Sequence, residues 1–91
     1  DAVWAALSPH YEAGRAEVGK KGVVRDAAVH RRIVEDFWRR TDEYDLMPVG
    51  VIPSPILGPK GNREFLLAAT TRDTPRTPPA THPPDFDAVV A

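Results

Sequence analysis

The sequence contains no cysteine and no long apolar run, and each of these two absences excludes a class of protein. Without cysteine the chain forms neither a disulfide scaffold nor a thiolate metal site. No stretch approaches the roughly 18 apolar residues that a membrane span requires. We therefore expect a cytoplasmic protein that makes no contact with a membrane.

Glycine is also missing from one informative pattern, because Gly-x-Gly occurs nowhere. A fold that holds a dinucleotide or S-adenosylmethionine should carry a glycine-rich turn after its first strand. These residues are therefore not expected to bind such a cofactor alone. The three histidines, His10, His30 and His82, show no metal-ligand spacing, so no metal site is expected either.

The chain has 91 residues and a net charge of -1, which allows one small domain without an overall basic character. It begins at Asp1 without a methionine, in what reads as the approach to a strand. We expect it to be a piece of something longer.

The order of elements predicts an α/β fold. The apolar run over 2–7 is typical of a buried strand, and Asp26 is a natural N-cap for a helix over 26–45. Two further strands are predicted at 49–52 and 63–70. We expect a right-handed, parallel first crossover and an antiparallel final strand. Half a sheet exposes an edge, so self-association through that edge is expected.

The helix is the clearest local prediction. Val29, Ile33 and Phe37 recur at four-residue spacing, and Val34 and Trp38 widen this apolar stripe. On the other face, two acid-before-base pairs at i,i+4 should support the helix: Glu35 with Arg39 and Asp36 with Arg40.

From residue 72 onward the composition changes. Five of the ten prolines fall here, among threonine and aspartate and without an apolar period. We predict a domain over 1–71 and a disordered, proline-rich tail over 72–91. A polyproline ligand for a partner domain is the functional alternative for this tail.

The stretch GRAEVGKK, residues 14–21, nearly matches a phosphate-binding P-loop, but Lys21 stands where the motif needs a hydroxyl. The stretch nevertheless belongs to a basic region. Between residues 14 and 32, six basic and two acidic residues leave four excess positive charges. The basic loop, with Arg15, Lys20, Lys21 and Arg25, suits a phosphodiester backbone, and a merely solvated loop is the alternative.

A turn-rich loop precedes the last predicted strand in SPILGPKGNREFLLAA, residues 54–69. Five residues are typical of a stiff connection: Pro55, Gly58, Pro59, Gly61 and Asn62. We expect Gly61 and Asn62 to take turn conformations with positive φ. Glu64 stands at the mouth of the strand, where such a loop would aim its carboxylate.

Two stretches resemble one protein family. SPHYEAGRAEVGKKGVVRD is similar to KPQFEAGREEVGKGGVVRD, and GVIPSPILGPKGNREFLLAA is similar to GLIPSPIxGPxGNxEFLL. Both patterns belong to TlyA-type proteins, the hemolysin-named, FtsJ-like ribosomal RNA 2'-O-methyltransferases. The resemblance covers about residues 3–70, with the expected helix between the two motifs.

The resemblance implies an S-adenosylmethionine-dependent methyltransferase with a Rossmann-like sheet, usually preceded by an S4-type RNA-binding domain. This chain would form the C-terminal part of that sheet, and the cofactor-binding half would lie upstream. The family uses a Lys–Asp–Lys–Glu tetrad on a ribose 2'-hydroxyl. Its glutamate falls on Glu64. The lysine of KPQFE falls on Ser8, which cannot supply the cation.

The resemblance also implies that the basic loop from Arg15 to Arg25 helps to hold ribosomal RNA. We therefore interpret the chain as a fragment of a TlyA-type RNA 2'-O-methyltransferase that is inactive alone. The alternative is a degenerate remnant that binds RNA or a protein without catalysis.

Overall fold

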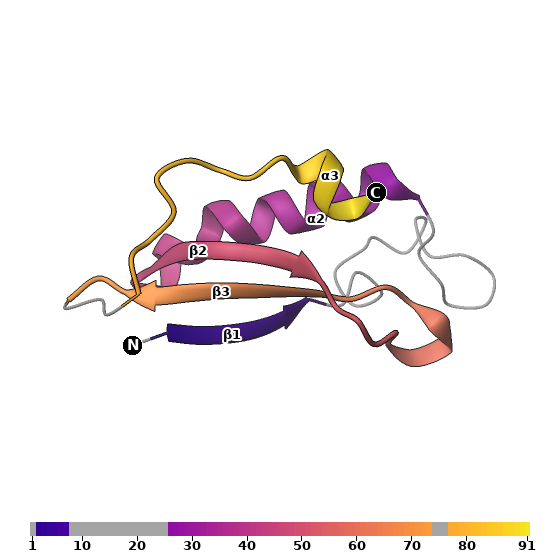
Figure 1. Ribbon diagram of the computed structural model, residues 1–91, viewed down its shortest axis with the longest axis horizontal. Helices are drawn as coiled ribbons and strands as arrows, with labels where there is room; N and C mark the ends of the chain where they lie inside the picture. Colours follow the sequence, from indigo (N-terminus) through magenta and orange to yellow (C-terminus); the bar gives the residue numbers. More distant parts are fainter. Residues whose placement is uncertain (1, 8–25, 74–76) are drawn as a thin grey trace.

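Three strands form one sheet in a computed structural model that describes residues 2–7, 26–73 and 77–91 (Figure 1). They are β1 (Ala2–Leu7), β2 (Leu46–Pro53) and β3 (Phe65–Thr71), in the spatial order β1-β3-β2. Both outer strands run antiparallel to β3, so they share a direction without pairing with each other. The α/β class and the antiparallel final strand agree with the sequence prediction. The position of β3 between the other two was not predicted.

The predicted helix is present and begins where its cap was expected. Asp26 accepts a hydrogen bond from the backbone N–H of Ala28 through Oδ1, at 2.9 Å. The helix α2 (Ala27–Arg39) continues as a 3₁₀ segment, η2 (Arg40–Tyr44). Asp45 then takes a left-handed conformation with φ 56°, which ends the helical path and allows β2 to begin.

Ion pairs support the outer face of α2. Arg39 Nη2 lies 2.6 Å from Glu35 Oε2, and Arg40 Nη1 lies 3.3 Å from Asp36 Oδ2, so both predicted pairs are confirmed. Hydrogen bonds from Arg40 to Glu43, and then to Asp36, raise the pKa of the Arg40 guanidinium above its ordinary value. The arginines of both pairs and Asp36 are exposed to solvent and Glu35 is half-buried, so these surface pairs contribute little to stability.

The core lies between α2 and one face of the sheet. Its buried side chains come from every described strand and helix, and they are Leu7, Val34, Trp38, Val51, Phe65, Leu67, Ala69, Phe86 and Val90. Ile33 and His30 are also buried on α2. His30 meets the ring of Phe65 edge-on at 5.7 Å between centroids, so it packs as a core residue. The apolar stripe predicted for α2 therefore faces the sheet.

β2 is longer than its prediction, which covered only 49–52. The strand includes Pro48 and ends at Pro53, although neither proline can donate to a ladder. An edge strand tolerates this, because among the described residues one side of β2 has no strand partner to receive a hydrogen bond. The carbonyl of Pro48 accepts instead from Ala80 N–H at 2.9 Å, and the register shifts between Pro48 and Gly50.

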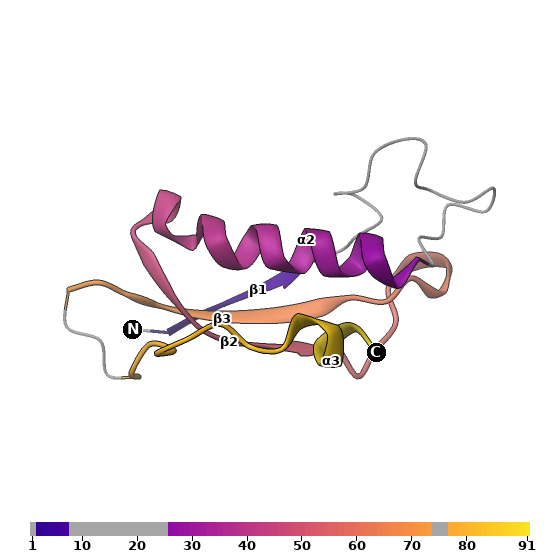
Figure 2. The same cartoon turned by 90° about the horizontal axis from the view of Figure 1, so that it is seen from above.

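The tail prediction is wrong for residues 77–91. A short helix, α3 (Phe86–Val90), lies beside α2 at the β2 edge of the sheet (Figures 1 and 2). Phe86 and Val90 are buried, and the Phe86 ring meets Trp38 edge-on at 6.1 Å. The prolines hide this segment from a composition argument, but two apolar side chains after an Asp85 cap suffice to dock it. The domain therefore extends beyond residue 71.

Candidate active-site carboxylate

The carboxyl ends of β1 and β2 meet at the start of β3. Leu7, the last residue of β1, pairs with Phe65, and Pro53, the last residue of β2, pairs with the same residue. Glu64 directly precedes Phe65, so it stands at the end of both strands. In open α/β sheets, ligands bind outside the carboxyl ends of strands that share a direction. The fold thus places Glu64 at the end of the sheet where a ligand site is expected.

The loop between β2 and β3 is closed by its own hydrogen bonds. Ser54 N–H donates to the carbonyl of Glu64 at 2.8 Å, which joins the two ends of the loop. Gly58 N–H donates to the carbonyl of Asn62 at 2.7 Å. Ile56 N–H donates to Ser54 Oγ at 3.2 Å. These bonds hold the backbone on both sides of Glu64 in one arrangement.

The turn residues of this loop agree with the prediction only in part. Gly61 has φ 79°, as expected, within the 3₁₀ turn η3 (Pro59–Gly61). Asn62 does not have a positive φ, and Lys60 takes that conformation instead with φ 60°. Asn62 is 1% exposed, so its place is at the buried base of the loop. The expectation of a positive φ at Asn62 is therefore wrong, although the residue lies in the loop and its carbonyl accepts from Gly58 N–H.

The side chain of Glu64 lies against Gly58. A Cβ built on Gly58 would stand 2.6 Å from Glu64 Oε2, so the carboxylate occupies the space that a side chain at 58 would need. Glu64 as a whole residue is half-buried. Its neighbour Arg63 extends elsewhere: its guanidinium lies over the Phe65 ring at 5.3 Å, and Nη1 donates to the carbonyl of Val90 at 2.6 Å.

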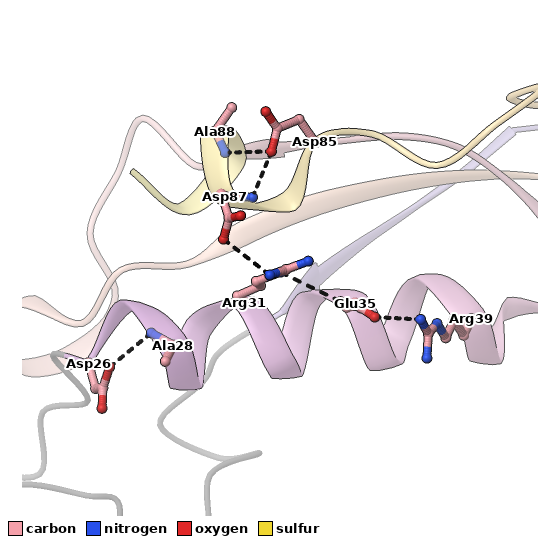
Figure 3. Close-up of polar contacts among 8 residues, drawn as sticks. All are labelled: Asp26, Ala28, Arg31, Glu35, Arg39, Asp85, Asp87 and Ala88. Carbon is pink, nitrogen blue, oxygen red and sulfur yellow. Dashed lines mark hydrogen bonds and ion pairs between the residues drawn. The ribbon is translucent and has the colours of Figure 1, made fainter.

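A second charged region lies between α2 and α3. A groove of about 670 Å³ there is lined by side chains of both signs, including Arg31, Glu35 and Asp87. Arg31 bridges the two helices, with 3.4 Å from Nη1 to Asp87 Oδ1 and 3.6 Å from Nε to Glu35 Oε1 (Figure 3). This chain of ion pairs ties α3 to α2, which is a structural role.

Metal ligands and cofactor-binding turns have characteristic arrangements in a fold. Within ranges 2–7, 26–73 and 77–91, no group of three or more His, Asp or Glu side chains is arranged to hold a metal ion. The glycines in those ranges lie inside β2 or in the β2–β3 loop. None of these described glycines forms a turn between a strand and a helix, which is where the glycine-rich turn of a dinucleotide or S-adenosylmethionine site would lie.

Curated relatives of the chain include rRNA methyltransferases. The Bacillus subtilis protein YqxC, provisionally named as an rRNA methyltransferase, is 43% identical over 63 residues. The 16S/23S rRNA (cytidine-2'-O)-methyltransferase TlyA of Mycobacterium tuberculosis is 39% identical over 66 residues. These matches cover 69% and 72% of this chain, but only 22% and 25% of the relatives. The chain thus spans about a quarter of their length.

Solved structures match nearly the whole chain. A provisionally named hemolysin of Streptococcus thermophilus aligns with a TM-score of 0.82 and 32% identity, over 98% of this chain and 31% of that one. A second, from Lactococcus lactis, aligns with a TM-score of 0.80 and 30% identity, over 98% and 41%. No protein-family model matches the chain.

This chain is homologous to a segment of the TlyA-type rRNA methyltransferases. The resemblance found in its two motifs is thereby confirmed. The structural match to the two hemolysin structures also takes in the tail, because it covers 98% of this chain.

Several predicted site residues lie outside the described residues. They are Ser8, at the position of the TlyA-type lysine, and the basic residues Arg15, Lys20, Lys21 and Arg25. Their roles stay predictions. In the described ranges, no helix is both long enough and apolar enough to cross a membrane.

Sequence reasoning missed the tie between Arg63 and α3. Its partner carbonyl, at Val90, is 27 residues away in the chain, so no local pattern points to it. Gly58 was identified as a loop residue, but the contact with Glu64 that distinguishes it from Gly61 is visible only in the structure.

Proposed function

We propose that this chain is the C-terminal part of a TlyA-type RNA 2'-O-methyltransferase domain and supplies one catalytic carboxylate, Glu64. The observation that carries the proposal is the position of Glu64 at the joint carboxyl end of β1 and β2. The homology to a segment of TlyA supports it. The sheet would then form the end of a Rossmann-like fold, and the substrate would be ribosomal RNA in the cytoplasm.

In this proposal Glu64 orients the group that accepts the 2'-hydroxyl proton and balances the charge of the neighbouring cation. A ribose 2'-hydroxyl is a weak nucleophile, and a carboxylate next to a cation positions a proton acceptor beside it. The closed β2–β3 loop supports such a role, because a group that must align a reacting atom works only when its backbone is held. General acid–base groups of this kind contribute about 10²–10⁴-fold to rate.

The methyl group would come from S-adenosylmethionine when it is bound in the intact enzyme. The described residues lack the glycine turn that such a cofactor needs, so the proposal assigns its binding to other parts of the domain. We expect the isolated chain to show no binding of S-adenosylmethionine by calorimetric titration. Appreciable affinity of the isolated chain for S-adenosylmethionine would contradict the assignment of cofactor binding to other parts of the domain.

Ser8 decides whether this segment is catalytically competent. In the family pattern a lysine stands at this position, and a serine hydroxyl carries no positive charge. We propose that the natural chain is impaired for this reason and that Ser8→Lys restores the missing cation.

A segment exchange tests the proposal directly. The matching segment of Mycobacterium tuberculosis TlyA, 39% identical over 66 residues, is replaced by the residues of this chain, with Ser8→Lys introduced. We expect this exchange protein to methylate ribosomal RNA. Adding Glu64→Gln should then lower kcat about 100-fold or more, because the amide keeps the shape and loses the charge.

Glu43→Gln is the matched control, since Glu43 is an exposed acid that pairs with Arg40 away from the site. It should leave kcat unchanged. If the exchange protein binds S-adenosylmethionine but does not methylate, the segment is not a methyltransferase segment. If Glu64→Gln behaves like Glu43→Gln, Glu64 is not the catalytic carboxylate.

The second candidate function is binding of RNA without catalysis. It is favoured by Ser8, which stands where the family pattern has a lysine. The basic loop would then contact phosphates, and affinity for ribosomal RNA would fall as salt rises. Exchanging Lys20 and Lys21 for glutamine should reduce the slope of log K against log salt by up to about 2. A salt-independent affinity would exclude this loop as the contact. Binding of a protein partner would leave RNA affinity undetectable.

We also propose that the isolated chain associates with itself through the β1 edge. In the described ranges, β1 pairs only with β3, so its outer edge has no strand partner. Val3 and Trp4 on this strand are 46% and 63% exposed. An open edge with apolar side chains is a ready template for a second strand.

A further inference from the structure

Gly58 and Glu64 share one small volume. A Cβ on Gly58 would lie 2.6 Å from Glu64 Oε2, 2.7 Å from Cδ and 2.9 Å from Cγ. All three separations are well below the 3.5–4.0 Å at which carbon atoms normally pack. The last half of the glutamate side chain therefore passes directly over the glycine backbone.

Backbone conformation does not explain the glycine. In the described residues the glycine with positive φ is Gly61, at 79°, and Gly58 is not among the positive-φ residues. An alanine at 58 would therefore meet none of the strain that a positive φ imposes. What it would meet is the carboxylate.

The backbone on both sides of this contact has little freedom to move. Gly58 N–H donates to the carbonyl of Asn62, and the Gly58 carbonyl accepts from Gly61 N–H at 3.2 Å. The carbonyl of Glu64 is bound by Ser54 N–H. The atoms that a Cβ at 58 would crowd belong to the end of the Glu64 side chain, so an added methyl group would displace the carboxylate and leave the loop closed.

We propose that Gly58 is a positioning residue, and that its missing side chain admits the Glu64 carboxylate to its place at the end of β1 and β2. The catalytic consequence rests on the proposed function, whereas the positioning itself does not. Gly58 is then needed because a side chain there would occupy the space of the Glu64 carboxylate. Gly61, in the same loop, is needed because its φ is positive.

Gly61→Ala is the matched control for Gly58→Ala. A Cβ on Gly61 would meet nothing within 4 Å, but its φ of 79° strains any residue with a side chain. We expect Gly61→Ala to lower the Tm of the 91-residue chain by about 4 °C and Gly58→Ala to lower it by less than about half of that.

The position of the carboxylate is measured in the same chain by NMR. Cross-relaxation between Gly58 Hα and Glu64 Hγ should be present in the natural chain and in Gly61→Ala. In Gly58→Ala, the Glu64 carboxyl carbon should change its chemical shift more than it does in Gly61→Ala. Absence of the cross-relaxation in the natural chain, or equal carboxyl shifts in both variants, would overturn the proposal.

The exchange protein with Ser8→Lys gives the catalytic readout. There Gly58→Ala should lower kcat on the order of 100-fold with a KM for RNA within about twofold, because a displacement of about 1 Å is enough for such a loss. Gly61→Ala should cost less in kcat despite its larger loss of Tm. The reverse ranking would show that Gly58 acts only through loop stability and would overturn the proposal.

The two readouts separate the two proposals. If the NMR contact is present and responds to Gly58→Ala while Glu64→Gln leaves methylation intact, Gly58 positions the carboxylate and the proposed function is wrong. If Glu64→Gln abolishes methylation and Gly58→Ala leaves both the carboxyl shift and kcat unchanged, the proposed function stands and the positioning role is wrong.

Discussion

The two faces of the sheet differ in how completely the described residues cover them. On the face toward α2, Phe65, Leu67 and Val51 are 0%, 4% and 8% exposed. On the opposite face, Trp4 is 63% exposed and Ile52 is 49% exposed. The alternation of a strand places these two sets on opposite sides, because Ile52 follows Val51 directly.

The same three strands therefore have one face that is buried under α2 and an opposite face that the described residues leave partly exposed. The sheet of a Rossmann-like fold normally has helices on both faces. Here α2 lies along one face of the sheet and α3 lies at its β2 edge, as Figure 2 shows from above. An apolar hollow of about 250 Å³ lies at the β1 side of the covered face, lined by Val3, Ala5 and Phe37 among others. On the face toward α2, the side chains of β2 are therefore well covered, whereas those of β1 are covered only in part.

The largest expected effect tests the covered face. Phe86→Ala removes the side chain by which α3 reaches Trp38 and should lower the free energy of unfolding by about 3 kcal/mol. Urea denaturation measures it through the midpoint. Ile52→Ala is the control on the opposite face, where an exposed side chain loses less than about 1 kcal/mol. Equal losses would erase the difference between the faces.

A smaller effect tests the tie between α3 and the site. Arg63→Gln removes the 2.6 Å hydrogen bond from Nη1 to the Val90 carbonyl and the contact with the Phe65 ring. The bond is only partly buried, so about 1 kcal/mol of stability should be lost. Arg39→Gln, on the exposed face of α2, should cost a few tenths of that amount. A double variant with Phe86→Ala should cost less than the sum, because both changes release the same helix.

A still smaller effect is expected at the surface pair between the helices. Asp87→Asn removes the charge that Arg31 meets at 3.4 Å, with both side chains well exposed. The loss of stability should be below about 0.5 kcal/mol and should vanish at high salt. A larger, salt-independent loss in thermal unfolding would mean that this pair, rather than apolar contact, docks α3.

The last change should leave stability unaltered. Trp4→Lys places a charge on the open face at the β1 edge, where the side chain is already 63% exposed. The free energy of unfolding of the monomer should stay within about 0.5 kcal/mol. Sedimentation equilibrium should show weaker self-association than for the natural chain, because a charged edge resists strand pairing. Unchanged association would remove the β1 edge as the interface.

The elements were predictable where the signal is local. The cap at Asp26 and the stripe of Val29, Ile33 and Phe37 lie within a few helical turns of one another, and the helix begins where they indicate. A strand forms over 2–7 as predicted, but it is an edge strand whose residues 3–6 are exposed, and not the buried strand that its apolar run indicated. The tail was not predictable in this way, since its prolines outnumber the two apolar residues, Phe86 and Val90, that dock it.

The candidate site was predictable in its letters and not in its geometry. The motif around Glu64 identifies this residue as a candidate catalytic carboxylate through its resemblance to the family pattern, and the loop glycines predict a turn. The sequence alone does not distinguish Gly58 from Gly61, because both read as turn residues. Only the folded loop shows that one glycine provides conformation and the other provides room.

By itself, the sequence determined the local elements: a capped amphipathic helix, short apolar strands and a stiff loop before the last of them. Caps, periodicity and turn residues act over a few positions, so the chain specifies them without reference to distant parts. The tertiary structure decided that β3 lies between β1 and β2, that α3 docks on α2, and that Glu64 rests on Gly58. These depend on contacts between segments far apart in the chain, where burial of apolar surface selects one arrangement among many that the local signals allow.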